Sequence, residues 1–400
     1  MLVSSLSCRF WTRASCLNPH KRRCLSATAL RPSLAPVRRR VLFFGADSFS
    51  CNVFAQLHAA RADLVDSLTV VTPPDQRTGR RLREIHRPPL RLLAEELGVP
   101  AIALPTTLLK GWQPPDDFLP TSAHDPPSPL NVLLTASFGH LIPTSLLSLF
   151  RPLNALNVHP SLLPRWRGAA PIQRGIIAGD ADGLTGEPMG VTVQELSRGK
   201  FDRGRILAQR AVDVPPHADF PALEPILARA GGDLLVSVLR TLEEHQECAQ
   251  PQGEERASLA PKLDKGSARV GWAALSAAEV CRLQRGVGHQ VRFCSTLCRY
   301  DSHLTKRTNS QYPLWATLSD AQLQLRLAPV PVPLPPQLAN APPGSLILEP
   351  STKQLVLRCA DAGEGAELQE VKKEGGKWVR AREWWNGLSK IRKGGAVALE

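Results

Sequence analysis

Two polar residues carry the chemistry that this sequence most clearly suggests. Asn157 and His159 stand two positions apart in Ala155–His159, a segment with the alternation of a strand, so both side chains project from one face. An amide and an imidazole both donate hydrogen bonds, and two converging donors suit the oxyanion of a tetrahedral intermediate. The spacing alone leaves a purely structural role for Asn157 and His159 open, and Asp202, followed by Gly204, is by itself a turn signal.

The elements expected to position these residues alternate between strands and helices. The short apolar runs Val41–Phe44, Leu68–Val71 and Asn131–Leu134 predict buried strands. Helices are expected from near Ser50 and over Pro89–Leu97. The order predicts an α/β fold with a doubly wound, Rossmann-like parallel sheet, in which ligands bind beyond the carboxyl ends of the strands.

Several classes of site are disfavoured. The Gly45–Ser50 segment lacks the second and third glycines of a dinucleotide-binding loop, and no phosphate-binding P-loop is present. No cysteine pair has zinc-ligand spacing; Cys294 and Cys298 lie four apart without a second pair, so the cysteines are expected to be reduced thiols. We therefore expect neither a nucleotide cofactor nor a metal.

The first 40 residues have a composition of their own. They contain nine basic residues and six serines but no acid, which is typical of an organelle transit peptide. A basic tail that binds nucleic acid is the alternative. Without this segment the net charge falls from +13 to about +4, so charge alone says little about nucleic-acid binding. No apolar stretch of about 18 residues occurs, and no membrane partner is expected.

The remainder is expected to form two domains. A catalytic domain is predicted over residues 41–245, a linker over 246–261 and a C-terminal domain over 262–390. In the last, Ser276–Glu279 resembles a capping box that opens a helix, and alternating leucines at 323, 325 and 327 predict a strand. Short strands with one helix predict a small, OB-like β-barrel. The loops 112–129 and 183–190 are expected at the surface.

The segment from Asn154 to Arg174 is the most informative part of the chain. Its run Asn-Val-His-Pro-Ser-Leu-Leu-Pro-Arg-Trp-Arg-Gly-Ala-Ala-Pro strongly resembles the signature of the folate-dependent formyltransferases. Other segments resemble the family in the same order: Thr72–Arg80, Ala136–Pro143, Gly190–Gln194, Phe201–Gly204 and, more faintly, Pro261–Trp272. The resemblance covers residues 41–210 well and residues 261–385 more weakly.

The resemblance implies a catalytic set and a co-substrate. The catalytic positions fall on Asn157, His159 and Asp202, where the Asp202 carboxylate would favour a charged imidazole. The co-substrate would be 10-formyltetrahydrofolate, used without a metal. The implied folate-binding residues are Ser137, Phe138, Gly139, Leu141, Ser161, Leu162 and Pro164. Phe201 stands where the family usually has an aliphatic residue, and we expect it to be buried.

The acceptor is less narrowly defined, because related enzymes formylate a purine precursor or an amino sugar, or hydrolyse formyl-folate. The long signature, the basic C-terminal end and the basic loop after the second strand favour initiator methionyl-tRNA, in the mitochondrial matrix, with the chain as a monomer. The expected tRNA-binding residues are Arg77, Arg80, Arg81, Arg165, Arg167, Lys372 and Lys373. A formyl-folate hydrolase, another amine formyltransferase and an inactive RNA-binding homologue remain alternatives.

Overall fold

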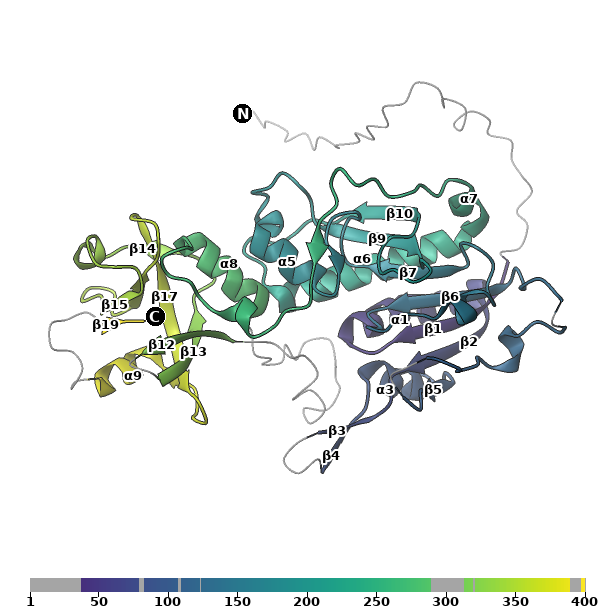
Figure 1. Ribbon diagram of the computed structural model, residues 1–400, viewed down its shortest axis with the longest axis horizontal. Helices are drawn as coiled ribbons and strands as arrows, with labels where there is room; N and C mark the ends of the chain where they lie inside the picture. Colours follow the sequence, from purple (N-terminus) through teal and green to yellow (C-terminus); the bar gives the residue numbers. More distant parts are fainter. Residues whose placement is uncertain are drawn as a thin grey trace, which may run out of the picture. The chain divides into compact units, whose positions relative to one another are not determined.

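The computed structural model describes residues 37–78, 83–106, 109–122, 124–288, 313–318, 321–388 and 397–399 (Figure 1). Almost all of the predicted leader therefore lies outside the described residues. The first strand begins at Arg39, whose side chain is buried, so the predicted boundary after residue 40 falls inside a strand. Within the described part of the chain, no helix is long and apolar enough to cross a membrane.

The N-terminal sheet has seven strands in the order β10-β9-β7-β6-β1-β2-β5. Its strands are β1 (Arg39–Gly45), β2 (Val65–Thr72), β5 (Ala101–Ala103), β6 (Asn131–Ala136), β7 (Ala155–His159), β9 (Gly190–Glu195) and β10 (Ile206–Ala211). The run from β5 to β7 is parallel, whereas β9 is antiparallel to β7 and β10 to β9. The predicted Rossmann-like parallel sheet is confirmed, with an antiparallel edge added to it.

Alternating side chains of β1 divide between two apolar cores. Val41 and Phe43 join one core and Leu42 and Phe44 the other, as expected for successive residues of a strand buried on both faces. The first core is completed by residues of these helices: α1 (Ser48–Ala59), α3 (Pro89–Glu96), α6 (Phe220–Arg240) and α7 (Leu242–Glu247). The second contains residues of α4 (Thr144–Leu147) and the 3₁₀ turn η2 (Asp116–Phe118).

Short elements connect the signature segment to more distant parts of the chain. The two-residue strand β8 (Arg167–Gly168) pairs with β11 (Leu259–Ala260), which lies inside the predicted linker. Helix α5 (Pro171–Ala178) and the turn η3 (Asp180–Asp182) follow β8. A separate hairpin joins β3 (Gln76–Thr78) and β4 (Glu84–His86). The predicted linker thus pairs with the catalytic signature instead of merely joining two domains.

The C-terminal region contains an antiparallel sheet in the order β12-β13-β17-β16-β15-β19 (Figure 1, green to yellow). Its strands are β12 (Leu314–Leu318), β13 (Ala321–Leu327), β15 (Ser345–Leu348), β16 (Leu355–Arg358), β17 (Glu364–Lys373) and β19 (Val397–Ala398), with β14 (Val332–Pro333) and β18 (Val379–Arg380) against β17. Residues of α8 (Ala277–Val287) and α9 (Ala381–Gly387) share its apolar core, and Ser276 and Glu279 form the predicted capping box. The small β-barrel prediction is confirmed as a curled half-barrel.

Candidate active site

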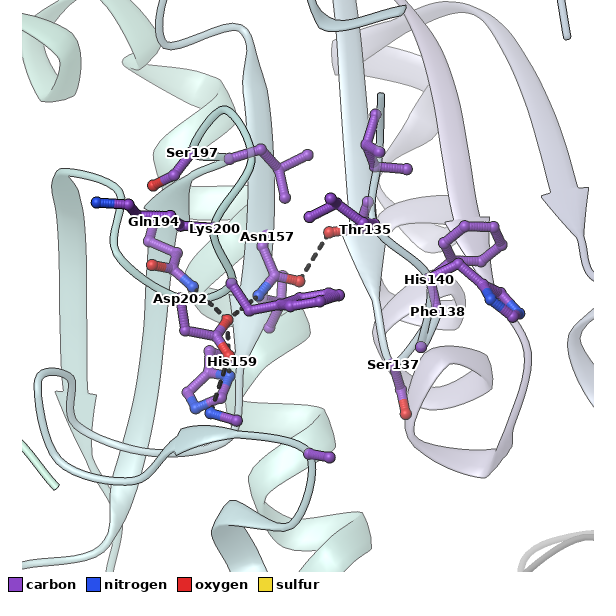
Figure 2. Close-up of a pocket in the computed structure, with 18 of the residues that line it drawn as sticks. Thr135, Ser137, Phe138, His140, Asn157, His159, Gln194, Ser197, Lys200 and Asp202 are labelled. Carbon is purple, nitrogen blue, oxygen red and sulfur yellow. Dashed lines mark hydrogen bonds and ion pairs between the residues drawn. The ribbon is translucent and has the colours of Figure 1, made fainter. Parts of the chain in front are cut away.

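Strand β7 places Asn157 and His159 at the carboxyl end of the parallel sheet. In the strand register Asn157 lies between Thr135 of β6 and Gln194 of β9 (Figure 2). The Thr135 hydroxyl donates to Asn157 Oδ1 at 2.7 Å, which directs the amide nitrogen away from β6. Thr135, Asn157 and Gln194 therefore lie on one face of the sheet. It is the face toward which the alternation of β7 predicted the side chains of Asn157 and His159 to project.

Asp202 approaches this face from the loop between β9 and β10. Its Oδ1 accepts from Gln194 Nε2 at 2.8 Å and from Asn157 Nδ2 at 3.4 Å, and its Oδ2 accepts from the Gly168 amide at 3.0 Å. Its φ of +52° lies in the left-handed region, which aspartate adopts more readily than most residues. Asp202 is therefore held by donors from three separate segments and is more than the turn residue that its sequence allowed.

His159 is fixed through both of its ring nitrogens. Nε2 lies 2.9 Å from the carbonyl oxygen of Trp166, and Nδ1 lies 3.5 Å from Asp202 Oδ1. A carbonyl oxygen only accepts, so Nε2 carries a proton in the neutral as well as in the charged ring. Nδ1 is therefore the ring nitrogen that faces Asp202. The ring itself is almost fully buried.

The turn that carries the Trp166 carbonyl is held by Asp180. This carboxylate, whose side chain is 1% exposed, accepts from Arg165 through both oxygens at 2.8 Å. It also accepts from Trp166 Nε1 and from the Thr185 hydroxyl, each at 2.7 Å. Trp166 has a φ of +60°, an uncommon conformation for a bulky residue that needs such support. Asp180 thereby supports the partner of His159.

A cavity of about 370 Å³ opens beside these residues (Figure 2). It is lined by Asn157, His159 and Asp202 together with residues 137–142, so four of the predicted folate residues (Ser137, Phe138, Gly139 and Leu141) lie on its wall. The other three do not line it. Ser161 is buried and donates to the Arg165 carbonyl at 2.7 Å, while Leu162 packs against Gly190 and Pro164 accepts from the Ser258 amide.

Phe201 departs from its expected environment. Its side chain is 57% exposed and lines the cavity beside Asp202, so the prediction of burial is wrong. The residue lies in the loop that brings Asp202 over the sheet, and not in a strand. Phe201 was expected to be buried because its family counterpart is usually apolar. It is instead an exposed aromatic residue at the rim of the site.

Two of the predicted tRNA-binding arginines lie inside internal networks. Arg165 is paired with Asp180, and Arg167 has a side chain only 4% exposed that donates to Gln252 and to both oxygens of Glu254. A guanidinium with these partners holds the signature loop together and is not presented to a phosphate. The geometry therefore disfavours a direct phosphate contact for both residues.

The other predicted tRNA residues are placed differently. Arg77 is exposed on β3, whereas Arg80 and Arg81 lie outside the described residues. Lys372 and Lys373 end β17, with Lys373 exposed and Lys372 Nζ 5.9 Å from the centre of the Trp378 ring. This end of β17 therefore presents two basic side chains, with the aromatic ring of Trp378 beside Lys372.

Sequence reasoning missed the residues that brace the catalytic set. Thr135 and Gln194 occupy the strands on either side of Asn157, and alternation in Gly190–Glu195 could have indicated Gln194. Gln252 carried no signal at all, yet its Nε2 lies within hydrogen-bond distance of Gln194 Oε1 (3.1 Å) and of the carbonyl oxygens of Asp202 (3.1 Å) and Gly204 (2.8 Å). The segment interpreted as a linker thus holds the loop of Asp202.

A pair of acids lies behind the cavity wall. Asp47 caps α1, accepting from the Ser50 amide, and also accepts from the Ser137 hydroxyl. Burial raises the pKa of Asp47 above its usual range. Burial, and then the charge of Asp47, raises the pKa of Glu224 to about 7. Among the described residues, no group of His, Cys, Asp or Glu has an arrangement that could hold a metal ion.

Comparison with known proteins gives this geometry a family. The family described as formyl transferase matches residues 39–239, which include Asn157, His159 and Asp202. The chain belongs to the formyl transferase family. This formyl transferase is 31% identical to the mitochondrial methionyl-tRNA formyltransferase of Homo sapiens over 354 residues, covering 87% of the chain and 77% of the relative. It is 35% identical to the methionyl-tRNA formyltransferase of Brucella abortus (strain S19) over 233 residues, covering 58% of the chain and 70% of the relative.

Solved structures agree with the fold. A variant of HypX from Aquifex aeolicus superposes on this formyl transferase with a TM-score of 0.50 at 15% identity, over 89% of the chain and 50% of the neighbour. The resemblance seen in the sequence is confirmed, and the chain is an enzyme of the transferase class. Membership of the family also accounts for the concentration of polar, buried side chains at one end of the sheet.

Proposed function

We propose that this formyl transferase moves the formyl group of 10-formyltetrahydrofolate to the α-amine of initiator methionyl-tRNA, through Asn157, His159 and Asp202. The observation that carries the proposal is the hydrogen-bonded set formed by these three side chains on the wall of the cavity. The names of the human and Brucella relatives support methionyl-tRNA as the acceptor. An inactive RNA-binding homologue is disfavoured, because all three polar residues are present and in mutual reach. A formyl-folate hydrolase is disfavoured because both relatives are methionyl-tRNA formyltransferases.

The cavity is suited to a flat, partly apolar donor. Phe138, Leu141 and Ile142 line it on the β6 side, and Asn157, His159 and Asp202 line the other. An apolar wall with a few convergent polar groups is typical of small-molecule sites. A folate ring would therefore lie along the 137–142 segment, with its formyl group directed at the polar set.

The polar set can stabilise the transition state of formyl transfer. The free amine attacks the formyl carbon, and the negative charge that develops on the formyl oxygen is stabilised by Asn157 Nδ2–H and by the proton on His159 Nδ1. Loss of one such donor typically raises a barrier by about 3 kcal/mol. Asp202 accepts the proton that leaves the attacking amine. Collapse of the tetrahedral intermediate then breaks the bond between the formyl carbon and N10, and the proton passes to N10 of the departing tetrahydrofolate.

The acceptor tRNA would be bound mainly through its phosphates. Arg77 and Lys373 are exposed, and Lys372 lies beside Trp378, so these residues remain proposed contacts, as do Arg80 and Arg81 from the sequence. Arg165 and Arg167 are withdrawn from the set because they are engaged internally. Phosphate contacts predict an affinity for tRNA that falls as salt concentration rises.

The remaining proposals concern the compartment in which the enzyme acts, its oligomeric state and its domains. The acid-free N-terminal segment would direct import, and the enzyme would act in the mitochondrial matrix as a monomer, without a metal. The predicted division into a catalytic domain, a linker and a C-terminal tRNA-binding domain is retained, with the linker also bracing the site. Import of a fusion of residues 1–40 to a reporter protein would test the first point.

The experiment that tests the function measures formylation of charged initiator tRNA with 10-formyltetrahydrofolate, beside release of formate without tRNA. His159→Ala and Asp202→Ala are each expected to abolish transfer, because each removes a member of the polar set. His245→Ala, on α7 and outside the cavity, is the matched control and should retain transfer.

The outcomes separate the candidate functions. Formyl-methionyl-tRNA made by the wild type and lost in the two variants supports the proposal. Transfer at the wild-type rate by either variant, with circular dichroism showing a folded protein, would refute the catalytic assignment. Release of formate without transfer would identify a hydrolase instead.

A further inference from the structure

A buried hydroxyl contacts the candidate catalytic amide from the neighbouring strand. Thr135 is on β6, directly opposite Asn157 on β7, and is 5% exposed. Its Oγ1 lies 2.7 Å from Asn157 Oδ1, while its other possible acceptor, the Leu156 carbonyl, is at a marginal 3.5 Å. The hydroxyl therefore makes its strong hydrogen bond to the amide oxygen of Asn157 (Figure 2).

The amide of Asn157 can take two orientations that differ by exchange of its oxygen and nitrogen. In the observed one, Nδ2 is 3.4 Å from Asp202 Oδ1, and its hydrogens point toward that carboxylate and the cavity. In the exchanged one, an amide oxygen would face a carboxylate oxygen at that distance, and two acceptors repel each other. The cavity would also receive an acceptor where a developing oxyanion needs a donor.

A chain of hydrogen bonds that runs from Thr135 to the Asp202 carboxylate follows from these contacts. Thr135 donates to Asn157, Asn157 donates to Asp202, and Asp202 faces His159 Nδ1 at 3.5 Å. At the far end His159 Nε2 donates to a carbonyl that cannot donate in return. Thr135 is the donor at the start of this chain, so its hydroxyl is the group that satisfies the amide oxygen in the productive orientation.

We propose that Thr135 is a positioning residue for formyl transfer: its hydroxyl holds the Asn157 amide with the nitrogen turned to the cavity. The proposal rests on the function proposed for Asn157. Without the hydroxyl, the half-buried amide oxygen would lose its protein hydrogen-bond donor, and the amide would sample the exchanged orientation. Substrate binding would be preserved, because the change alters a group that acts on the developing charge.

The test compares Thr135→Val with the wild type. Valine keeps the shape of threonine but removes the donor, so kcat is expected to fall about 10- to 100-fold, less than the loss expected on removing a whole oxyanion donor. KM for both substrates should change little. Thr135→Ser keeps the hydroxyl and should restore most of kcat, a rescue that a packing role for the lost methyl group would not produce.

A matched control exists on the same sheet. Thr72 on β2 is fully buried, and its hydroxyl has no hydrogen-bond partner among the described residues. Thr72→Val makes the same chemical change at a residue outside the cavity and should leave kcat at the wild-type value. Thermal unfolding of each variant checks that the sheet is intact, and Thr135→Ala replaces Thr135→Val if the latter fails to fold.

A double-mutant cycle with Asn157→Ala distinguishes the possible failures. If Thr135 acts through the amide, Thr135→Val should cost nothing further in kcat once the amide is gone. An equal loss in both backgrounds, or no loss in the wild-type background, would overturn the role of Thr135 while leaving the function intact. Full turnover by Asn157→Ala alone would instead overturn the proposed catalytic set.

Discussion

Asp180 is expected to contribute to stability far more than its position in a short turn suggests. The substitution Asp180→Ala removes the acceptor of Arg165, Trp166 and Thr185 at once. Breaking a buried ion pair from one side costs about 3 to 5 kcal/mol. Because the Arg165 side chain is 22% exposed and can regain water, we expect the lower end, about 3 kcal/mol.

Urea-induced unfolding measures this loss directly. The matched control is Asp63→Ala, which removes an acid whose ion pair with Arg240 is largely exposed and spans 3.9 Å, and which should cost about 0.5 kcal/mol or less. The kcat of Asp180→Ala should also fall, since the turn it holds presents the Trp166 carbonyl to His159. If Asp180→Ala costs no more free energy of unfolding than Asp63→Ala, the assignment of Asp180 as a structural hub is wrong.

Two further predictions concern Glu224 and Gly168. The Glu224 carboxyl has a pKa of about 7 in the folded protein against an ordinary value of 4.5, so the native state holds its proton between these two pH values and wild-type stability falls as pH rises from 4.5 to 7. Urea unfolding of Glu224→Gln should give the wild-type free energy of unfolding near pH 5 and exceed it by up to about 3 kcal/mol at pH 8. Equal stability of the two proteins at pH 8 would contradict this. Gly168 has a φ of +128°, and a Cβ at this position would lie 2.6 Å from the Ala260 carbonyl oxygen. Gly168→Ala should therefore lower the free energy of unfolding by about 2 kcal/mol or more, and should lower kcat because it displaces the backbone amide that donates to Asp202. A variant with wild-type stability and turnover would contradict this prediction.

The strands were predictable because burial leaves a periodic signal in the sequence. The run from Val41 to Phe44 is apolar throughout because β1 is buried on both faces, and the strand over Ala155–His159 was expected with the bounds that the structure gives. The alternation of that strand also indicated that Asn157 and His159 share a face. Local pattern was sufficient wherever a residue's environment depends on its own strand or helix.

The bracing contacts were not predictable in this way. Gln252 and Gln194 are 58 positions apart, and nothing in the sequence around either residue indicates the other. Arg167 was expected to contact tRNA, but it pairs with Glu254, an acid 87 positions away that no local pattern indicates. The prediction that Phe201 is buried was wrong for a different reason. An apolar residue in a loop has no periodicity from which its burial can be judged.

The pairing of β8 with β11 limits how far this enzyme can be divided into modules. A fragment that ended at residue 245 would keep Asn157, His159 and Asp202 but would lose Gln252 and the strand that pairs with the signature. The smallest self-sufficient catalytic piece therefore extends past residue 260. Fusion or domain-exchange experiments should place their junctions beyond that point, because a junction at the apparent linker would remove the residues that hold the Asp202 loop and the signature segment in place.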